Sequence, residues 1–283
     1  QRIEPPHARF RRLRLRRGRD ARTTQHGNDR QQGSGGRSRR HVPRYPLLDC
    51  PAGLQVDKNV KGLPELFSNN RRWAAAMESR QPGFFSGLTA QQAPRYLWIG
   101  CSDSRVPANE IVGLAPGELF VHRNVANLVL HTDFSCLSVL QYAIDVLKVE
   151  HVMVVGHYGC GGVQAAWEGR QLGLVDNWLQ SVRDVAHLYR DPLRQLADDS
   201  ARLDRLCELN VLVQARRLCR STVAQQAWDR GQRLIVHAWV YRLTDGLLRD
   251  LGFCAPSLAT AEEHYARAAG FGTIGTGDEG SRA

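Results

Sequence analysis

The 283-residue sequence has no apolar run near the length of about 18 residues that a membrane-spanning helix requires. We therefore expect a soluble or peripheral protein. No apolar segment of about seven or more residues follows the basic N-terminus, which argues against a secretory signal peptide. The seven cysteines are odd in number and scattered over a long chain, which is not typical of a disulfide framework. This composition suits a reducing compartment, and we expect the protein in the cytoplasm.

Excess charge is also absent from most of the chain. The formal net charge is +10, yet residues 1–50 alone contain 14 arginines and only four acidic residues. Residues 51–283 therefore hold 24 basic and 24 acidic residues and are neutral. A neutral body argues against nucleic acid as its main partner, because nucleic-acid-binding domains are usually strongly basic.

The N-terminal part differs in composition from the rest of the chain. Residues 1–52 are rich in arginine and lack a sustained apolar period, so we expect a disordered tail. It suits an organellar transit peptide, or a basic arm for nucleic acid or anionic lipid. A mis-assigned start is the third interpretation, because the chain begins with Gln1 and has 35 Arg against three Lys. We expect the folded domain at 53–271 and a flexible tail at 272–283.

Short apolar segments alternate with helical patterns from about residue 62. The predicted strands are 96–99, 119–121, 152–155 and 234–239. The predicted helices are 69–79, capped by its asparagine, and two later helices at 176–190 and 201–229. Another helix follows a cap at Thr132 or Asp133, with an apolar face of Phe134, Leu137, Leu140, Ile144 and Leu147. Apolar strands separated by helices predict an α/β fold with a parallel sheet covered on both sides.

Metal-binding residue types follow two of these strands. Cys101, Asp103 and Arg105 come after the first strand, and His157 and Cys160 come after the third. The carboxyl ends of parallel strands lie at one edge of the sheet, where ligands bind in such folds. Two thiolates and one imidazole are three good zinc ligands, and a catalytic zinc keeps its fourth position open. The pattern therefore predicts a catalytic zinc site, although Asp103 and Arg105 taken alone also suit an ordinary salt bridge.

The remaining histidines and cysteines have structural interpretations. We expect packed or hydrogen-bonded structural roles for His122, His151 and His237. Three cysteines lie in helical stretches, where free cysteine usually acts as a small core residue, namely Cys136, Cys207 and Cys219. None of these residues is nominated as a proton shuttle, and the sequence does not identify one.

The motifs at 101–105 (CSDSR) and 157–162 (HYGCGG) resemble those of the β-class carbonic anhydrases. The resemblance runs from about residue 68 to about residue 270 and includes the segments 82–85, 117–127, 207–210 and 245–248. It implies a mainly parallel sheet with one antiparallel edge strand, flanked by helices and assembled as a homodimer or dimer of dimers. The activity it implies is the reversible hydration of carbon dioxide to bicarbonate and a proton.

The resemblance also implies roles for the residues at the strand ends. Cys101, His157 and Cys160 match the zinc ligands of the family. Asp103 and Arg105 match the pair that orients zinc-bound hydroxide. If this pair opens, Asp103 becomes a fourth zinc ligand that displaces water.

Three further residues match a regulatory site in the allosteric members of the family. Trp98, Arg123 and Tyr241 correspond to a triad that binds non-catalytic bicarbonate, which implies control by bicarbonate and pH. The alternative is that Trp98 and Tyr241 are core aromatic residues and that Arg123 is a structural ion-pair partner.

Two other functions remain open at the level of sequence. The same fold and zinc site would suit hydrolysis of carbon disulfide or carbonyl sulfide. A protein of a different class would use the arginine-rich tail to bind nucleic acid or a membrane, with the zinc domain as a scaffold.

Overall fold

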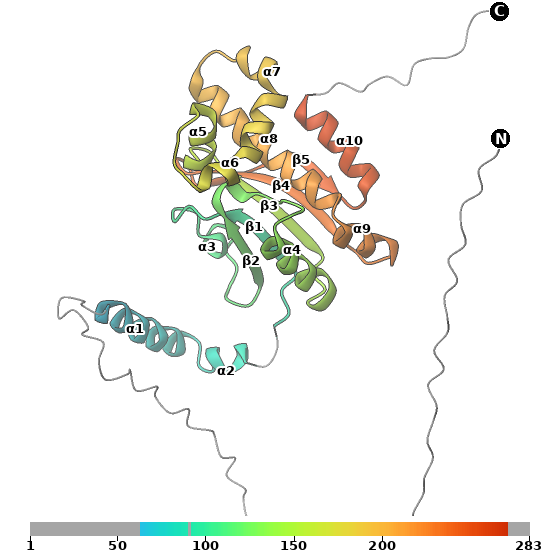
Figure 1. Ribbon diagram of the computed structural model, residues 1–283. Coiled ribbons are helices and arrows are strands. Elements are labelled where there is room, and N and C mark those ends of the chain that lie inside the picture. Colours follow the sequence, from blue (N-terminus) through green and yellow to red (C-terminus); the bar gives the residue numbers. More distant parts are fainter. Residues whose placement is uncertain (1–62, 90–91, 271–283) are drawn as a thin grey trace, which may run out of the picture. The chain divides into compact units, whose positions relative to one another are not determined.

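The computed structural model describes residues 63–89 and 92–270. The predictions for the tail at 1–52 and for 272–283 concern residues outside these ranges. The described residues form a five-stranded sheet in the order β2-β1-β3-β4-β5, with helices packed against it (Figure 1). None of the helices in the described ranges combines the length and the apolar character needed to cross a bilayer.

The sheet is parallel except at one edge. Its strands are β1 (Tyr96–Cys101), β2 (Leu119–Asn124), β3 (His151–His157), β4 (Ile235–Arg242) and β5 (Leu247–Ala255). Strand β1 pairs in parallel with β2 and β3, β3 pairs in parallel with β4, and β5 runs antiparallel to β4. This confirms the α/β fold with a mainly parallel sheet and one antiparallel edge strand.

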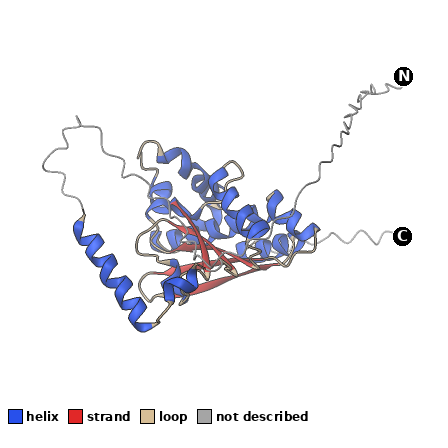
Figure 2. Cartoon of the chain, turned by 90° about the horizontal axis from the view of Figure 1, so that it is seen from below, coloured by secondary structure: helices blue, strands red, loops and turns tan. Residues whose placement is uncertain are grey.

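The helices cover the two faces of the sheet unequally. The described helices, of which α1 and α2 contribute to neither buried core of the sheet, are α1 (Pro64–Arg80), α2 (Phe84–Leu88), α3 (Ala108–Val112), α4 (Phe134–Gln141), α5 (Gly161–Glu168), α6 (Val175–Leu188), α7 (Arg190–Arg194), α8 (Asp199–Cys219), α9 (Thr222–Asp229) and α10 (Leu258–Ala269). Short 3₁₀ and π segments lie at Val125–Asn127 and Tyr142–Val146. Most helices lie on one side of the strands (Figure 2), where they form the larger buried core. In the smaller core on the other face, the described partners of the strands come mainly from 106–114 around α3. The sequence predicts helices on both faces of the sheet. In the described residues they cover one face fully and the other only in part.

Several element boundaries differ from the predictions. Helix α1 begins at Pro64 and not at Asn69, because proline suits the first turn of a helix. The predicted helix at 201–229 is two helices, since the Ser221 side chain accepts a hydrogen bond from the backbone of Ala224 and starts α9. Asp133 caps α4 as predicted, but Phe134 in its first turn is 82% exposed and does not face the core.

The strand that carries the predicted histidine ligand approaches helix α8 closely. A Cβ atom on Gly156 would lie 2.4 Å from Cγ2 of Val211 in α8. Only glycine therefore fits at this position without a shift of the helix. The close approach fixes the end of β3 against the largest helix of the core.

Candidate metal centre

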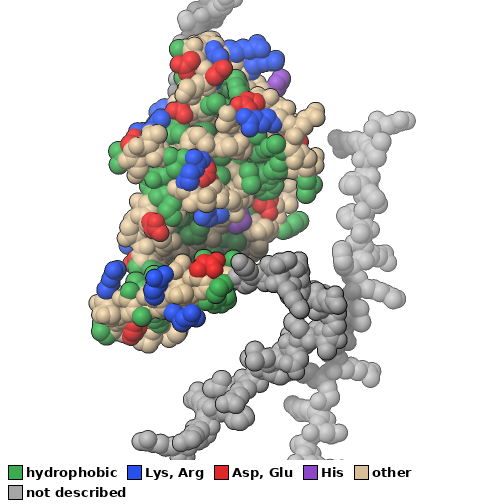
Figure 3. Space-filling view, turned by 90° about the vertical axis from the view of Figure 1, so that its left-hand side faces the viewer, with side chains coloured by type: hydrophobic (Ala, Val, Ile, Leu, Met, Phe, Trp, Pro, Cys, Tyr) green, Lys and Arg blue, Asp and Glu red, His purple; other side chains and the backbone are tan. Residues whose placement is uncertain are grey.

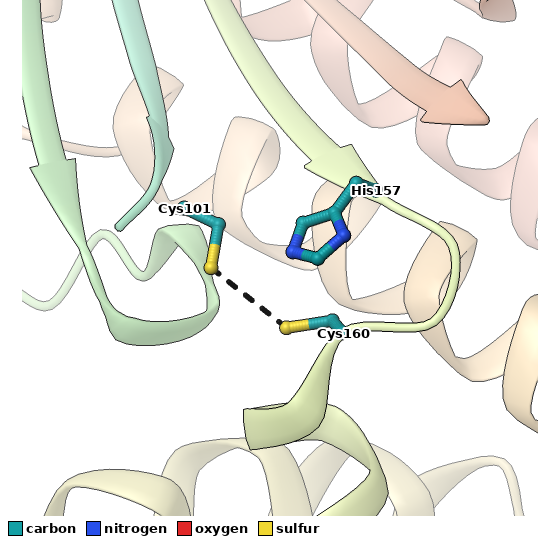
Figure 4. A group of neighbouring side chains, drawn as sticks. All are labelled: Cys101, His157 and Cys160. Carbon is teal, nitrogen blue, oxygen red and sulfur yellow. Dashed lines mark hydrogen bonds between the residues drawn. The ribbon is translucent and has the colours of Figure 1, made fainter. Parts of the chain in front are cut away.

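The three predicted ligands come together at the carboxyl edge of the sheet. Cys101 is the last residue of β1, His157 is the last residue of the neighbouring β3, and Cys160 precedes the first turn of α5. Their ligand atoms all lie within 4.8 Å of one another, and all three residues are buried. Figure 4 shows the two sulfur atoms and the imidazole ring turned toward a common point.

The geometry of this group fits a zinc ion. The two Sγ atoms are 3.8 Å apart, which matches two tetrahedral ligands at the usual Zn–S distance of about 2.3 Å. His157 Nδ1 lies 3.1 Å from the carbonyl oxygen of Tyr158, to which it can donate. Its Nε2 is buried and has no hydrogen-bond partner among the described residues. Such a bond at one ring nitrogen fixes the other as an acceptor for a metal.

The two thiols differ in acidity because they share a proton. The hydrogen bond from Cys160 lowers the pKa of Cys101 to about 4, although burial opposes this shift. The same contact and burial raise the pKa of Cys160 above its ordinary value. The contact therefore favours the thiolate form of Cys101, and a bound cation would stabilise both thiolates.

Beside the ligands, Asp103 and Arg105 form a bidentate ion pair. Arg105 Nε donates to Oδ1 of Asp103 at 2.9 Å, and its Nη2 donates to Oδ2 at 2.7 Å. These hydrogen bonds lower the pKa of Asp103 well below its ordinary value. Oδ2 also lies 3.7 Å from Nε2 of His157. The carboxylate is therefore ionised, held by Arg105 and adjacent to the ligand group.

Arg123 supports the same loop from β2. Its Nε donates to the carbonyl oxygen of Cys101 at 2.9 Å, and its Nη2 donates to that of Asp103. Among the described residues Arg123 therefore bonds to backbone oxygens, and the ion pair of the alternative interpretation is not seen there.

The other two members of the matched triad lie on neighbouring strands. Trp98 is fully buried, and its Nε1 has no acceptor among the described residues. The indole nitrogen lies over Gly100, where a Cβ would be only 2.2 Å away, and Gly100 pairs with Arg123 in the sheet. Tyr241, on β4, is partly buried in the same core as Trp98. No hydrogen bond among the described residues joins these three side chains directly.

Sequence reasoning missed two supports of the site. The Tyr158 hydroxyl donates to Glu208 on α8 at 2.6 Å, and this glutamate was noted only as part of a matched segment. The backbone of Ala126 and Asn127 has positive φ values of 63° and 48°, which residues other than glycine rarely adopt. The backbone of Ala126 also hydrogen-bonds to Cys101 and helps to lower its pKa. Asparagine tolerates this region better than most residue types, but nothing in the sequence signals it at Ala126.

The histidines outside the metal centre have the expected structural contacts. Nδ1 of His151 lies 3.1 Å from Nε2 of His237, and His122 lies 3.3 Å from the Asn124 amide. His122 also groups with Asp133 and Cys136. Asp133 there accepts the backbone hydrogen bonds that start α4, and burial raises the pKa of Cys136 to about 12. This second group therefore favours a neutral thiol and a capping carboxylate.

Comparison with known proteins gives consistent matches. Residues 96–248 match the family model described as carbonic anhydrase. A carbonic anhydrase of Emericella nidulans is 49% identical over 194 residues, which cover 69% of this chain and 85% of that protein. The solved β-carbonic anhydrase of Coccomyxa, in complex with acetazolamide, is 38% identical with a TM-score of 0.68 and covers 74% of this chain and 97% of its own. A tetrameric β-carbonic anhydrase of Sordaria macrospora is 36% identical, with a TM-score of 0.65, over 68% of this chain and 98% of its own.

Proposed function

This chain belongs to the β-class carbonic anhydrase family and is a carbonic anhydrase, and we propose that Cys101, His157 and Cys160 hold its catalytic zinc. The observation that supports this most strongly is the buried, unpartnered Nε2 of His157 beside two thiols 3.8 Å apart. When bound there, a zinc ion would lower the pKa of a water molecule and so supply the nucleophile for carbon dioxide near neutral pH.

Asp103 and Arg105 are proposed to orient that nucleophile. An oxygen that attacks carbon dioxide must present a lone pair to the carbon, so its O–H bond has to point elsewhere. Asp103 Oδ2 can accept this O–H because it is ionised and lies beside the ligand group. The two hydrogen bonds from Arg105 fix the carboxylate in this orientation and keep it from becoming a ligand itself.

The Arg105→Ala variant tests whether Asp103 and Arg105 orient the nucleophile. With Arg105 absent, Asp103 is free to take the fourth ligand position, so zinc should be retained while carbon dioxide hydration falls by about 100-fold or more. Stopped-flow hydration and zinc content are measured together. Arg230→Ala, which breaks the ion pair with Asp145 away from the ligands, should hydrate at the wild-type rate. A normal rate in Arg105→Ala would show that the pair is only a salt bridge.

We further propose that bicarbonate binds between Trp98, Arg123 and Tyr241 and regulates the enzyme. The support is the buried Nε1 of Trp98, because an unmet donor of this kind costs about 1–3 kcal/mol unless an acceptor reaches it. Arg123 is bonded to the Cys101 and Asp103 carbonyl oxygens. An anion that drew Arg123 away would therefore disturb the loop that carries the ion pair, and it would favour the inactive arrangement.

Hydration rates as a function of pH, for the wild type and Trp98→Phe, test the regulatory site. The wild type should be inhibited by high bicarbonate and should have low activity below about neutral pH. Both effects should weaken in Trp98→Phe, with zinc content equal at each pH. Superimposable profiles would identify Trp98 as a core residue without a regulatory role.

We infer that the chain assembles as a homodimer or a dimer of dimers. The relatives from Sordaria macrospora are described as tetrameric. The described residues also expose large apolar side chains along α1, including Leu66, Phe67 and Trp73, and contact surfaces of this kind are typical of oligomers. Sedimentation equilibrium of the zinc-loaded protein should give two or four chains, and a monomer at micromolar concentration would contradict the inference.

A further inference from the structure

A basic cavity lies among four helices, none of which carries Asp103 or Arg105. Its volume is about 450 Å³, within the range usual for small-molecule sites. The walls come from α5, α6, α7 and α8, and the lining residues are Trp167, Ala186, His187, Arg190, Arg194 and Arg202. In Figure 3, basic side chains lie beside a histidine near the top of the molecule. This is the end of the molecule at which α7 lies in Figure 1.

The arginines of this cavity have too few acidic partners. Neither Arg190 nor Arg194 makes an ion pair or side-chain hydrogen bond among the described residues, and both are exposed. Arg202 donates to Asp199 at 2.7 Å and to the Leu196 carbonyl oxygen at 3.0 Å. Its Nε is buried and has no acceptor among the described residues. Of the three guanidinium groups that line this cavity, only that of Arg202 makes an ion pair among the described residues, with Asp199.

This imbalance is local, because the chain outside residues 1–50 is neutral as a whole. Like charges gathered around one cavity repel each other, and a bound anion with several charges would remove that repulsion. Guanidinium groups also bind planar oxyanions through two parallel hydrogen bonds. The half-buried indole of Trp167 adds a flat apolar wall against which a carbon skeleton can pack.

We propose that this cavity binds a small organic polyanion with two or more phosphate or carboxylate groups. One singly charged ion such as bicarbonate would leave most of the volume and two of the three guanidinium groups without a partner. A ligand with separated oxyanion groups satisfies Arg190 and Arg194 on α7 together with Arg202 on α8. The site is independent of the zinc ligands and of the proposed bicarbonate triad.

Isothermal titration of the zinc-loaded full chain, in about 0.1 M salt, tests this proposal with pyrophosphate and citrate as separate probes. We expect one site per chain for at least one probe, and the probe that binds more tightly distinguishes phosphate from carboxylate ligands. The variant Arg190→Gln/Arg194→Gln should weaken that binding by about tenfold or more, the loss expected for one or two charged hydrogen bonds. Zinc content and hydration rate should not change, because neither arginine contacts the metal centre.

The control is Arg71→Gln/Arg80→Gln, which removes the same charge from two exposed arginines of α1. This control should bind the probe within about twofold of the wild type. Equal losses in the two double variants would show only non-specific attraction to positive charge. Undiminished binding in Arg190→Gln/Arg194→Gln would place the probe elsewhere, for example on the arginines of residues 1–50, and would overturn the proposal, as would no binding at all.

Discussion

At the scale of single residues, Tyr158 links two of the proposed zinc ligands to the helical core. It stands between His157 and Cys160 in sequence, and its hydroxyl donates to Glu208 on α8. Burial, followed by this hydrogen bond, raises the pKa of Tyr158 above its ordinary value, so the hydroxyl remains a donor at working pH. The Arg242 guanidinium stacks on the ring, with its Cζ 3.9 Å from the ring centroid. These two contacts tie the loop that carries the proposed ligands to the helical core.

The Tyr158→Phe variant should release zinc faster, because it removes the hydroxyl and leaves Glu208 with one donor fewer. A loss of about 1–1.5 kcal/mol of loop stability corresponds to a roughly tenfold faster transfer of zinc to a chelator. Glu208→Gln should have a smaller effect, since an amide oxygen still accepts. Tyr142→Phe, at an exposed position, is the control. Wild-type transfer kinetics in Tyr158→Phe would show that the hydrogen bond does not support the site.

The sequence predicts the reactive residues better than their supports. Cysteine, histidine and aspartate are recognisable because few residue types bind metal or accept protons, and the parallel strands bring their ends together. The positive φ of Ala126 has no such signature, because it depends on packing against residues far away in sequence. Its carbonyl oxygen accepts from Asn210 on α8, 84 positions later. Such long-range contacts are invisible to spacing patterns.

At the scale of elements, α10 is joined to α8 by a small ionic cluster. Glu262 on α10 accepts hydrogen bonds from Arg216 at 2.5 Å and from Arg220 at 2.7 Å. Burial acts to raise the pKa of Glu262, but the two arginines outweigh it and lower the pKa below the ordinary value of 4.5. A carboxylate with a lowered pKa stabilises the folded state above its unfolded pKa, and this contribution is lost as the pH falls through the lowered value.

The Glu262→Gln variant should therefore be less stable than the wild type at pH 7. We expect a difference of about 1 kcal/mol or less, because all three side chains are partly exposed and water screens the pairs. Below about pH 4.5 the difference should begin to shrink, because Glu262 protonates in the unfolded chain before it does in the folded one. Urea unfolding at pH 7 and at pH 4 measures this change. Glu263→Gln, next to it but largely exposed, should show little effect at either pH, and a pH-independent gap for Glu262→Gln would contradict the linkage.

The positions of most helices and strands were predictable from sequence. Several of their first and last residues, and the buried face of α4, were not. Three of the four predicted strands lie within observed strands, and the fourth, 234–239, begins one residue before β4, because buried parallel strands are apolar throughout. Strand β5 did not stand out by pattern, since its residues alternate irregularly between buried and exposed. Helical periodicity predicts Phe134 on the core side of α4. The structure exposes it, which periodicity alone cannot show when a helix contributes only a few residues to the core.

At the scale of the whole molecule, the residues that match the family lie in the body of the chain. Deleting residues 1–52 should leave zinc content, oligomeric state and hydration rate unchanged, because this segment has no apolar period with which to join a core. Stopped-flow hydration and sedimentation of the shortened chain measure this. A loss of activity or of assembly would show that the arginine-rich segment belongs to the folded enzyme.

Zinc content measured alongside carbon dioxide hydration, in the wild type, Cys160→Ala and Cys136→Ala, tests the metal centre most directly. The wild type should bind one zinc per chain at this site and catalyse hydration. Cys160→Ala should lose zinc or nearly all activity, because three ligands leave no redundancy. Cys136→Ala removes an equally buried thiol and should keep both, at a cost of about 1–2 kcal/mol in stability. Full zinc and normal hydration in Cys160→Ala would contradict the assignment of the site.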